Sequence, residues 1–273
     1  MIPRTHAEDI LRNIGACDDA AIDLAEGALA LAALDRPGVA PDRYRDHIRT
    51  LGDDVGDAIA AGTDLRVALT DVVLGVHGYR GDTLTYDDIQ NANLMRVIDR
   101  KKGLPVALGI LFLQAARAHG YAADGLNFPG HFLIRLGDGG DRLIVDPFND
   151  GLERTAADLR ELLKVTAGLD AELAPEHYET VGNRDILIRL QNNIKARHER
   201  AGRAEDALRV IDGMQLFAPN SLFLWREAGV LQARLGNLGA AIEAFETIVE
   251  RADSDAMRHD AASIIQKLKT RLN

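Results

Sequence analysis

One segment constrains the fold more than any other: residues 105–119 are apolar on nearly every side. The segment starts at Pro105, a residue suited to the first turn of a helix, and is followed by Gly120, which ends one. A helix that is apolar all round has to be buried on every side. We therefore expect a central helix that the rest of a domain surrounds.

Further helices and strands are predicted on both sides of this segment. Short runs of strand character follow it, separated by Pro129-Gly130 and by a glycine-rich hairpin signal at 138–141. The expected strands are residues 124–128, 131–136 and 142–145. Helical periodicity precedes the segment and resumes near Thr155. The expected early helices are residues 7–34 with a break at Gly15, a second from about Asp42, a third from Asp64 to about 78, and a fourth from Asp87 or Asp88 to about Lys101.

The C-terminal part carries an internal repeat. Residues 202–208 recur at 236–242, an offset of 34 residues, which is the period of tetratricopeptide (TPR) units. The second unit has the residue types of a TPR at four positions: Trp225, Gly229, Ala241 and Phe245. In the first unit Ala207 and Pro219 fit, whereas Gln191 stands at the Trp position. We predict two degenerate helical hairpins and a capping helix at about 255–272, serving either as a scaffold or as a peptide groove.

Composition limits the kind of partner. The net charge of −10 disfavours a nucleic-acid binder held by phosphate contacts, and equally an anionic membrane surface. The only cysteine is Cys17, so an intramolecular disulfide and a cysteine-rich zinc site are excluded. No signal-peptide pattern, paired-histidine spacing or phosphate-binding glycine loop is found in the sequence. We expect a cytoplasmic protein without a cofactor or metal.

Four motifs resemble one known family. Gly103-Leu104-Pro105-Val106-Ala107-Leu108 is followed by Ala118-His119-Gly120-Tyr121, then Asn127-Phe128-Pro129-Gly130-His131-Phe132-Leu133, then Val145-Asp146-Pro147-Phe148. This series resembles the transglutaminase-like core of the SirB-one family, whose members commonly carry a TPR-type tail. Two earlier motifs fit the same pattern: Asn91-Ala92-Asn93-Leu94 and Arg100-Lys101-Lys102-Gly103. The close resemblance covers roughly residues 64–151.

The resemblance implies an α+β fold with a transglutaminase-like, papain-like core and an all-α TPR-like tail. The expected domains are a helical N-terminal part at 1–85, the core at 86–175 (about 1–175 overall, with Pro175 near its end), and the repeats at 180–273. The family is also linked to the control of invasion-gene expression. A regulatory role follows only from that link, since the acidic chain shows no DNA-binding face.

The wider superfamily performs thiol chemistry with three groups: a cysteine at the N-terminus of the central helix, a histidine on a neighbouring strand and an aspartate on the next one. By the motifs, His131 matches the histidine and Asp146 the aspartate. The cysteine position falls on or near Pro105, where no Cys, Ser or Thr occurs. Thiol transamidation or proteolysis by the usual route is therefore not expected.

Cys17 is a poor substitute, because Asp18 and Asp19 flank it and neighbouring carboxylates disfavour a thiolate. We expect a partly buried, inert cysteine.

Three roles remain open for His131 and Asp146. They form a structural pair between strands, or line a retained pocket that binds a peptide or small molecule, or activate water with His131 as base and Asp146 as its orienter. Candidate binding residues beside them are Asn91, Asn93, Phe128 and Phe132. The first hypothesis is a non-catalytic protein that binds a protein or peptide. The alternative is a hydrolase that works without a covalent thiol intermediate. The sequence leaves the partner and the oligomeric state open.

Overall fold

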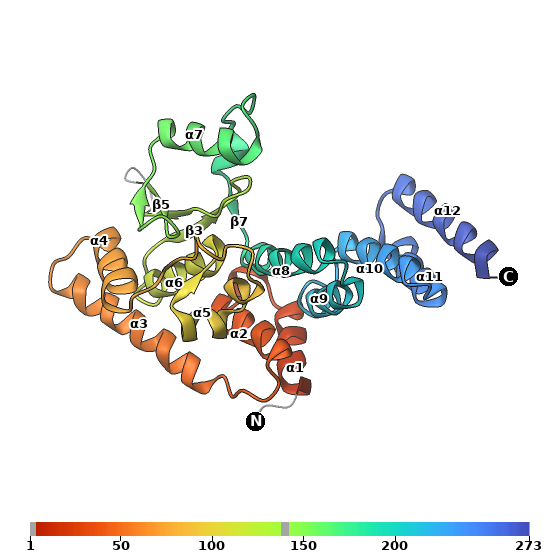
Figure 1. The fold of residues 1–273 in the computed structure, drawn as a ribbon, viewed down its shortest axis with the longest axis horizontal. Helices are drawn as coiled ribbons and strands as arrows, with labels where there is room; N and C mark the ends of the chain where they lie inside the picture. The colour runs from red at the N-terminus through yellow and green to blue at the C-terminus, as the bar shows by residue number, and fades with distance from the viewer. Residues whose placement is uncertain (1–3, 138–141, 273) are drawn as a thin grey trace. The chain divides into compact units, whose positions relative to one another are not determined.

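The structure is a computed structural model that describes residues 4–137 and 142–272 (Figure 1). The chain forms two compact units. The first comprises Met1–Ala7 and Asp18–Leu190, and the second comprises Glu8–Cys17 and Gln191–Asn273. Most of the first helix, α1 (Arg4–Ala16), therefore belongs with the C-terminal repeats rather than with the core.

The centre of the first unit is helix α6 (Pro105–Arg117). Its residues from Pro105 to Leu113 are all buried, as expected for a helix that is apolar on every side. Helices α2 (Leu24–Asp35) and α3 (Asp42–Ala60) contact it directly. Helix α5 (Leu94–Arg100) contacts α2 in turn.

A five-stranded antiparallel sheet covers another side of α6. Its order is β6-β5-β4-β3-β7, with Ile134 of β4 opposite Val145 of β5. The strands are β3 (Ala123–Leu126), β4 (Ile134–Leu136), β5 (Leu143–Asp146), β6 (Leu152–Glu153) and β7 (Thr180–Val181). The sheet lies between α6 and α7 (Ala156–Ala167) (Figure 1).

Each face of the sheet packs on one helix. Leu126 and Leu133 form a buried cluster with Leu159 and Leu163 of α7. On the other side, the ring of Phe132 lies against Gly109 of α6 so closely that a Cβ there would sit 2.5 Å from the ring carbon Cδ1. Gly109 therefore allows the central helix to approach the sheet.

Several elements differ from the sequence prediction. β4 starts three residues later than expected, so His131 precedes the strand, and β3 ends at Leu126. The two-residue strands β6 and β7 were not predicted. Strand β7 pairs with β3, although it follows Pro175, the residue near which the core was expected to end. The expected hairpin turn at 138–141 lies outside the described residues.

The predicted fourth helix is divided in two. Asp88 caps a short 3-10 helix, η3 (Ile89–Ala92), and α5 begins afterwards at Leu94. The division occurs because Asn93 has extended backbone angles and its side chain accepts a hydrogen bond from the Arg96 N–H, as an N-cap residue does. The third helix is likewise divided, into α4 (Leu65–Leu69) and the π-helix η2 (Thr70–Val76).

A polar cluster joins the end of α5 to α3. Lys101 follows α5 and precedes β2 (Lys102–Gly103), which pairs in parallel with β1 (Arg80–Gly81). Its ammonium donates to Nε2 of His47 on α3 at 2.9 Å, and the same Nε2 lies 2.7 Å from the hydroxyl of buried Tyr79. Burial first, and then the charges of Lys101 and His77, lower the pKa of His47 from 6.5 to about 4.

This lowered pKa predicts a stability loss in mild acid. Between about pH 6.5 and pH 4 the unfolded chain binds a proton at His47 that the folded chain does not bind, so the free energy of unfolding falls as the pH falls. We expect His47→Gln to remove this part of the pH dependence, measured by chemical denaturation at a series of pH values. A variant that loses as much stability as the parent across this window would contradict the interpretation.

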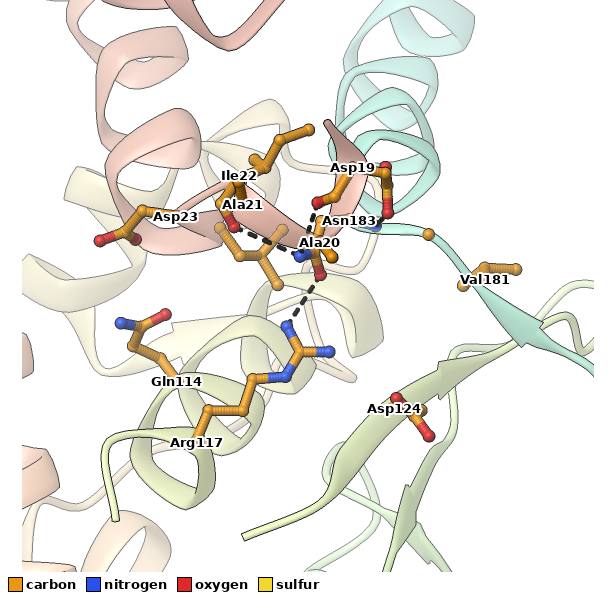
Figure 2. A pocket seen from close by; sticks show the side chains of 12 residues that line it. Asp19, Ala20, Ala21, Ile22, Asp23, Gln114, Arg117, Asp124, Val181 and Asn183 are labelled. Carbon is orange, nitrogen blue, oxygen red and sulfur yellow. Dashed lines mark hydrogen bonds between the residues drawn. The ribbon is translucent and has the colours of Figure 1, made fainter. Parts of the chain in front are cut away.

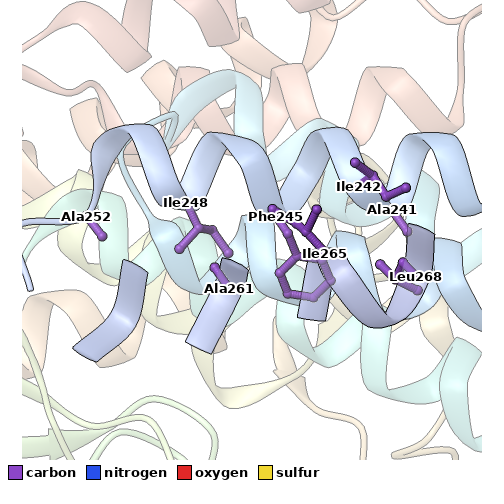
Figure 3. Close-up of a cluster of buried hydrophobic side chains, with 8 residues drawn as sticks. All are labelled: Ala241, Ile242, Phe245, Ile248, Ala252, Ala261, Ile265 and Leu268. Carbon is purple, nitrogen blue, oxygen red and sulfur yellow. The ribbon is translucent and has the colours of Figure 1, made fainter. Parts of the chain in front are cut away.

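The second unit consists of antiparallel helices. They are α8 (Asn183–Arg200, from Gln191 onward in this unit), α9 (Ala204–Phe217), α10 (Leu222–Arg234), α11 (Leu238–Arg251) and α12 (Asp255–Leu272). Figure 3 shows the apolar cluster between α11 and α12, with Phe245 at its centre. Gly229 of α10 lies against the Phe245 ring, as the TPR pattern requires. The repeats and the capping helix are as predicted.

The first repeat carries a lysine at the position equivalent to Gly229. Thirty-four residues before Gly229 stands Lys195, which is 6% exposed. Its ammonium binds both carboxylate oxygens of Glu227 on α10 at 2.6 Å. The N-terminal segment joins the same unit, because Gly15 of α1 lies against the backbone carbonyl of Leu216 and against Pro219, where a Cβ would not fit.

Candidate functional site

His131 is positioned by a tight turn. Gly130, just before it, has a φ of 70°, a conformation that glycine adopts without strain, and a Cβ there would collide with Thr166. Arg189 of α8 donates hydrogen bonds to the main-chain oxygens of Phe128 and His131. The turn is therefore held from both ends.

Asp146 ends β5 and is fully buried. Its Oδ1 lies 2.8 Å from Nε2 of His131 and also accepts from the backbone N–H groups of Phe148 and Asn149. Its Oδ2 accepts from the side chains of Asn149 and Arg154, each at 2.8 Å. Both carboxylate oxygens of Asp146 thus accept several hydrogen bonds, and His131 makes only one of them.

These partners decide the charge of Asp146. Burial alone raises the pKa of a carboxyl group, but the hydrogen bonds and charge of His131, with the bonds from Asn149 and Arg154, outweigh it. The pKa of Asp146 is lowered from 3.8 to about 2. Asp146 is therefore ionised at neutral pH and orients the His131 ring through Nε2.

The other ring nitrogen of His131 is where a nucleophile would be activated. Nδ1 has no hydrogen-bond partner among the residues that the structure describes. In the first turn of α6, Leu104 is the N-cap without a side-chain hydrogen bond, and the next three residues are Pro105, Val106 and Ala107, all buried. None of them can attack a carbonyl group.

Cys17 follows α1 in the second unit. The structure corrects the expectation of a partly buried thiol, because Cys17 is exposed. It directly follows the last residue of α1, Ala16.

The other predicted binding residues are not gathered around His131. Asn91 bonds to the Thr85 carbonyl and to Arg100, and Asn93 caps α5. Phe128 is buried in the cluster under α7, and Phe132 lies between α6 and β3, against Gly109 and Gly125. All four are buried, with at most 3% of the surface exposed.

Sequence reasoning missed several residues of the site. Arg154 and Arg189 lie 8 and 58 residues from the groups that they bind, and no local pattern marks them. Asn149 could have been found, since it follows the Asp146-Pro147-Phe148 motif directly. Phe148 packs edge-on against the His131 ring, with ring centres 5.9 Å apart, and against Tyr86 on its other side at 5.7 Å.

A separate pocket of about 480 Å³ opens elsewhere in the first unit (Figure 2). Arg117 lies in it and donates to Asn183, whose own backbone N–H donates to Asp19. None of the sequence-predicted site residues lines this pocket. Across residues 4–137 and 142–272, no group of His, Cys, Asp and Glu is arranged to hold a metal ion. Over the same residues, no helix combines the length and apolarity needed to cross a membrane.

The chain matches the transglutaminase-like superfamily core over residues 42–192 and a tetratricopeptide repeat over 194–269. The first match covers more than half of the 273 residues, so the protein belongs to the transglutaminase-like superfamily. Within it, the protein is a member of the UPF0162 family, in agreement with the SirB-like resemblance.

The chain is similar to UPF0162 proteins of two bacteria. The UPF0162 protein of Vibrio cholerae serotype O1 is 30% identical over 263 residues, 94% of each chain. That of Xylella fastidiosa strain Temecula1 is 28% identical over 237 residues, 84% of each chain. F-box only protein 21 of Mus musculus is 27% identical over 170 residues, which are 58% of this chain and 25% of that protein.

Proposed function

We propose that this protein is a non-catalytic member of its superfamily that binds a protein or peptide partner, and that it acts in the cytoplasm. The observation that carries the proposal is the first turn of α6, which presents no nucleophile although His131 and Asp146 are paired at 2.8 Å. A histidine–aspartate pair without a nucleophile forms no acyl-enzyme. TPR repeats generally mediate protein–protein interactions, and this chain carries them at 194–269.

A groove in the second unit supports binding. A cavity of about 360 Å³ lies between α10, α11 and α12. Phe223 and Met257 line it and are 61% and 45% exposed, although both are large apolar side chains. Arg226 and Asp260 form an exposed ion pair at its edge, 3.4 Å apart. An apolar surface with a polar rim is typical of a peptide-binding groove.

The proposal predicts that Phe223 anchors the partner. Peptides are selected from a displayed library on the purified full chain, and their Kd is measured by calorimetry. Phe223→Ser should weaken binding at least about fivefold, because a buried aromatic anchor contributes more than about 1 kcal/mol. The matched control is Val230→Ser, since Val230 lies on the same helix, is 38% exposed and does not line the groove. Failure to select any peptide, or equal Kd values for both variants, would count against the proposal.

The second candidate is a hydrolase in which His131 activates water. It is favoured by one observation: Asp146 orients Nε2 and leaves Nδ1 without a partner among the described residues. The test is a panel of ester and peptide substrates with the parent and with His131→Gln, which keeps an N–H donor. The candidate requires that the substitution abolish turnover while the Tm stays nearly unchanged. Turnover that persists in the variant, or that is absent from the parent, rejects it.

A further inference from the structure

The cluster around Lys101 lies outside the site described above. Three separated segments meet there: α3 with His47, the segment after η2 with Tyr79, and the end of α5 with Lys101. The Lys101 ammonium lies 2.9 Å from His47 Nε2, 3.3 Å from the Tyr79 hydroxyl and 4.4 Å from the centre of the Tyr79 ring. One amine is thus held by a ring nitrogen, a phenol and an aromatic face.

The backbone at Lys101 is unusual for a residue with a side chain. Its φ of 55° and ψ of 30° are left-handed, at a helix end where glycine is the common choice. For a residue with a Cβ the left-handed form is less stable than the right-handed form. Strained backbone of this kind is found preferentially at functional sites. In this conformation the amine lies beside His47 and Tyr79.

The surroundings favour a free amine. Burial lowers the pKa of Lys101, and Asp99 opposes this only in part. His47 stays neutral down to about pH 4, so its Nε2 accepts the Lys101 N–H. Burial raises the pKa of Tyr79, which keeps the phenol protonated and able to donate. The remaining titratable neighbours are His77 and Asp54, whose side chains lie 2.8 Å apart, with the His77 ring 5.3 Å from that of His47.

We propose that Lys101 is a nucleophilic amine that captures a small aldehyde as a Schiff base, with Tyr79 as proton donor and His47 as a positioning residue. The free amine attacks the carbonyl carbon, forming a C–N bond, and its proton moves to the oxygen. Tyr79 protonates the resulting hydroxyl, which leaves as water while the C=N bond forms, and the imine nitrogen loses its proton to the phenolate. No oxidant or reductant is needed.

The capture is stoichiometric and needs no turnover, so it does not depend on the binding function proposed above. Lys101 and His47 are both partly exposed, which gives an aldehyde access from solvent. Tyr79 is only 2% exposed, which limits the aldehyde to a small one.

The test treats the full chain with acetaldehyde at pH 7, reduces the imine with cyanoborohydride and locates the ethylated lysines by peptide mass spectrometry. Lys102, the next residue and also partly exposed, is the internal control. We expect Lys101 to be labelled severalfold faster than Lys102, because burial lowers the pKa of Lys101 and the Tyr79 hydroxyl lies 3.3 Å from its amine as a proton donor. Equal or slower labelling of Lys101 overturns the proposal.

Three variants separate reactivity from a purely structural role. Lys101→Arg keeps the charge and should remove the fast-labelled site, whereas Lys102→Arg should leave it. Tyr79→Phe, which removes only the hydroxyl, should slow imine formation severalfold at a Tm close to that of the parent. His47→Gln should shift the pH profile of Lys101 labelling. The opposite result is that Tyr79→Phe and His47→Gln change only the Tm and leave the rate and the pH profile of Lys101 labelling unaltered. In that case Lys101 has a purely structural role and the proposal fails.

Discussion

Replacing Asp146 with alanine is expected to lower the free energy of unfolding by about 3–5 kcal/mol, the range for removing one partner of a buried charged pair. Asp146 is fully buried, and its two oxygens accept hydrogen bonds from His131, Asn149 and Arg154 as well as from backbone N–H groups. The substitution leaves the Arg154 guanidinium without its carboxylate. Chemical denaturation at pH 7 measures the difference.

The control is the other member of the pair. His131→Ala removes one hydrogen bond to Asp146 and leaves the contacts from Arg154 and Asn149, so we expect a smaller loss of about 1–3 kcal/mol. If the two variants were equally stable, the carboxylate would not be the centre of this network.

The same network predicts behaviour in acid. The folded pKa of Asp146, about 2, lies below the ordinary 3.8, so the unfolded chain binds the proton first as the pH falls. The stabilisation is complete above about pH 3.8 and is lost as the pH falls towards 2. In Asp146→Ala this part of the acid sensitivity should be missing.

The second large effect is expected at Gly109. In an open helical position, Gly→Ala stabilises by up to about 1 kcal/mol. At Gly109 the sign should reverse, because the added Cβ would overlap the Phe132 ring, and overpacking of a core costs typically 1–3 kcal/mol. We expect Gly109→Ala to lower the free energy of unfolding by about that amount, with a larger loss for Gly109→Val.

Two further variants make this test specific. Gly239→Ala is the matched control, since Gly239 lies in α11 with nothing within 4 Å of an added Cβ, and it should be neutral or stabilising. Phe132→Leu should reduce the penalty of Gly109→Ala, and a double-mutant cycle measures the coupling. If the effects of the two substitutions on the free energy of unfolding were additive, the side chains at positions 109 and 132 would not be in contact.

The sequence predicted best where a pattern is long or a motif is specific. The central helix followed from its all-round apolar character, and the repeats followed from their 34-residue offset. The pairing of His131 with Asp146 came from the family motifs, and the structure brings the two within 2.8 Å. These three predictions could be made without knowing which residues far apart in the sequence contact each other.

The remainder depended on contacts that no local pattern records. β6 and β7 have two residues each, too short for periodicity to reveal. Arg154 reaches the Asp146 carboxylate from the residue after β6, and Arg189 reaches the main chain at His131 from 58 residues away. The sequence contained a signal for the division of the fourth helix at Asn93, because asparagine is a favoured N-cap residue. The apolar periodicity continues on both sides of Asn93, and it therefore favoured one continuous helix.

The grouping of Glu8–Cys17 with the C-terminal repeats has a consequence for protein synthesis. The ribosome makes the N-terminal segment first, whereas Leu216 and Pro219, against which Gly15 packs, are made about two hundred residues later. Translation proceeds at roughly 5–20 residues per second, so α1 waits on the order of ten seconds or more for its partners. During that interval most of the core unit, Asp18–Leu190, is made between the two segments of the second unit, so the contact of Gly15 with Leu216 and Pro219 forms only after the core has been synthesised.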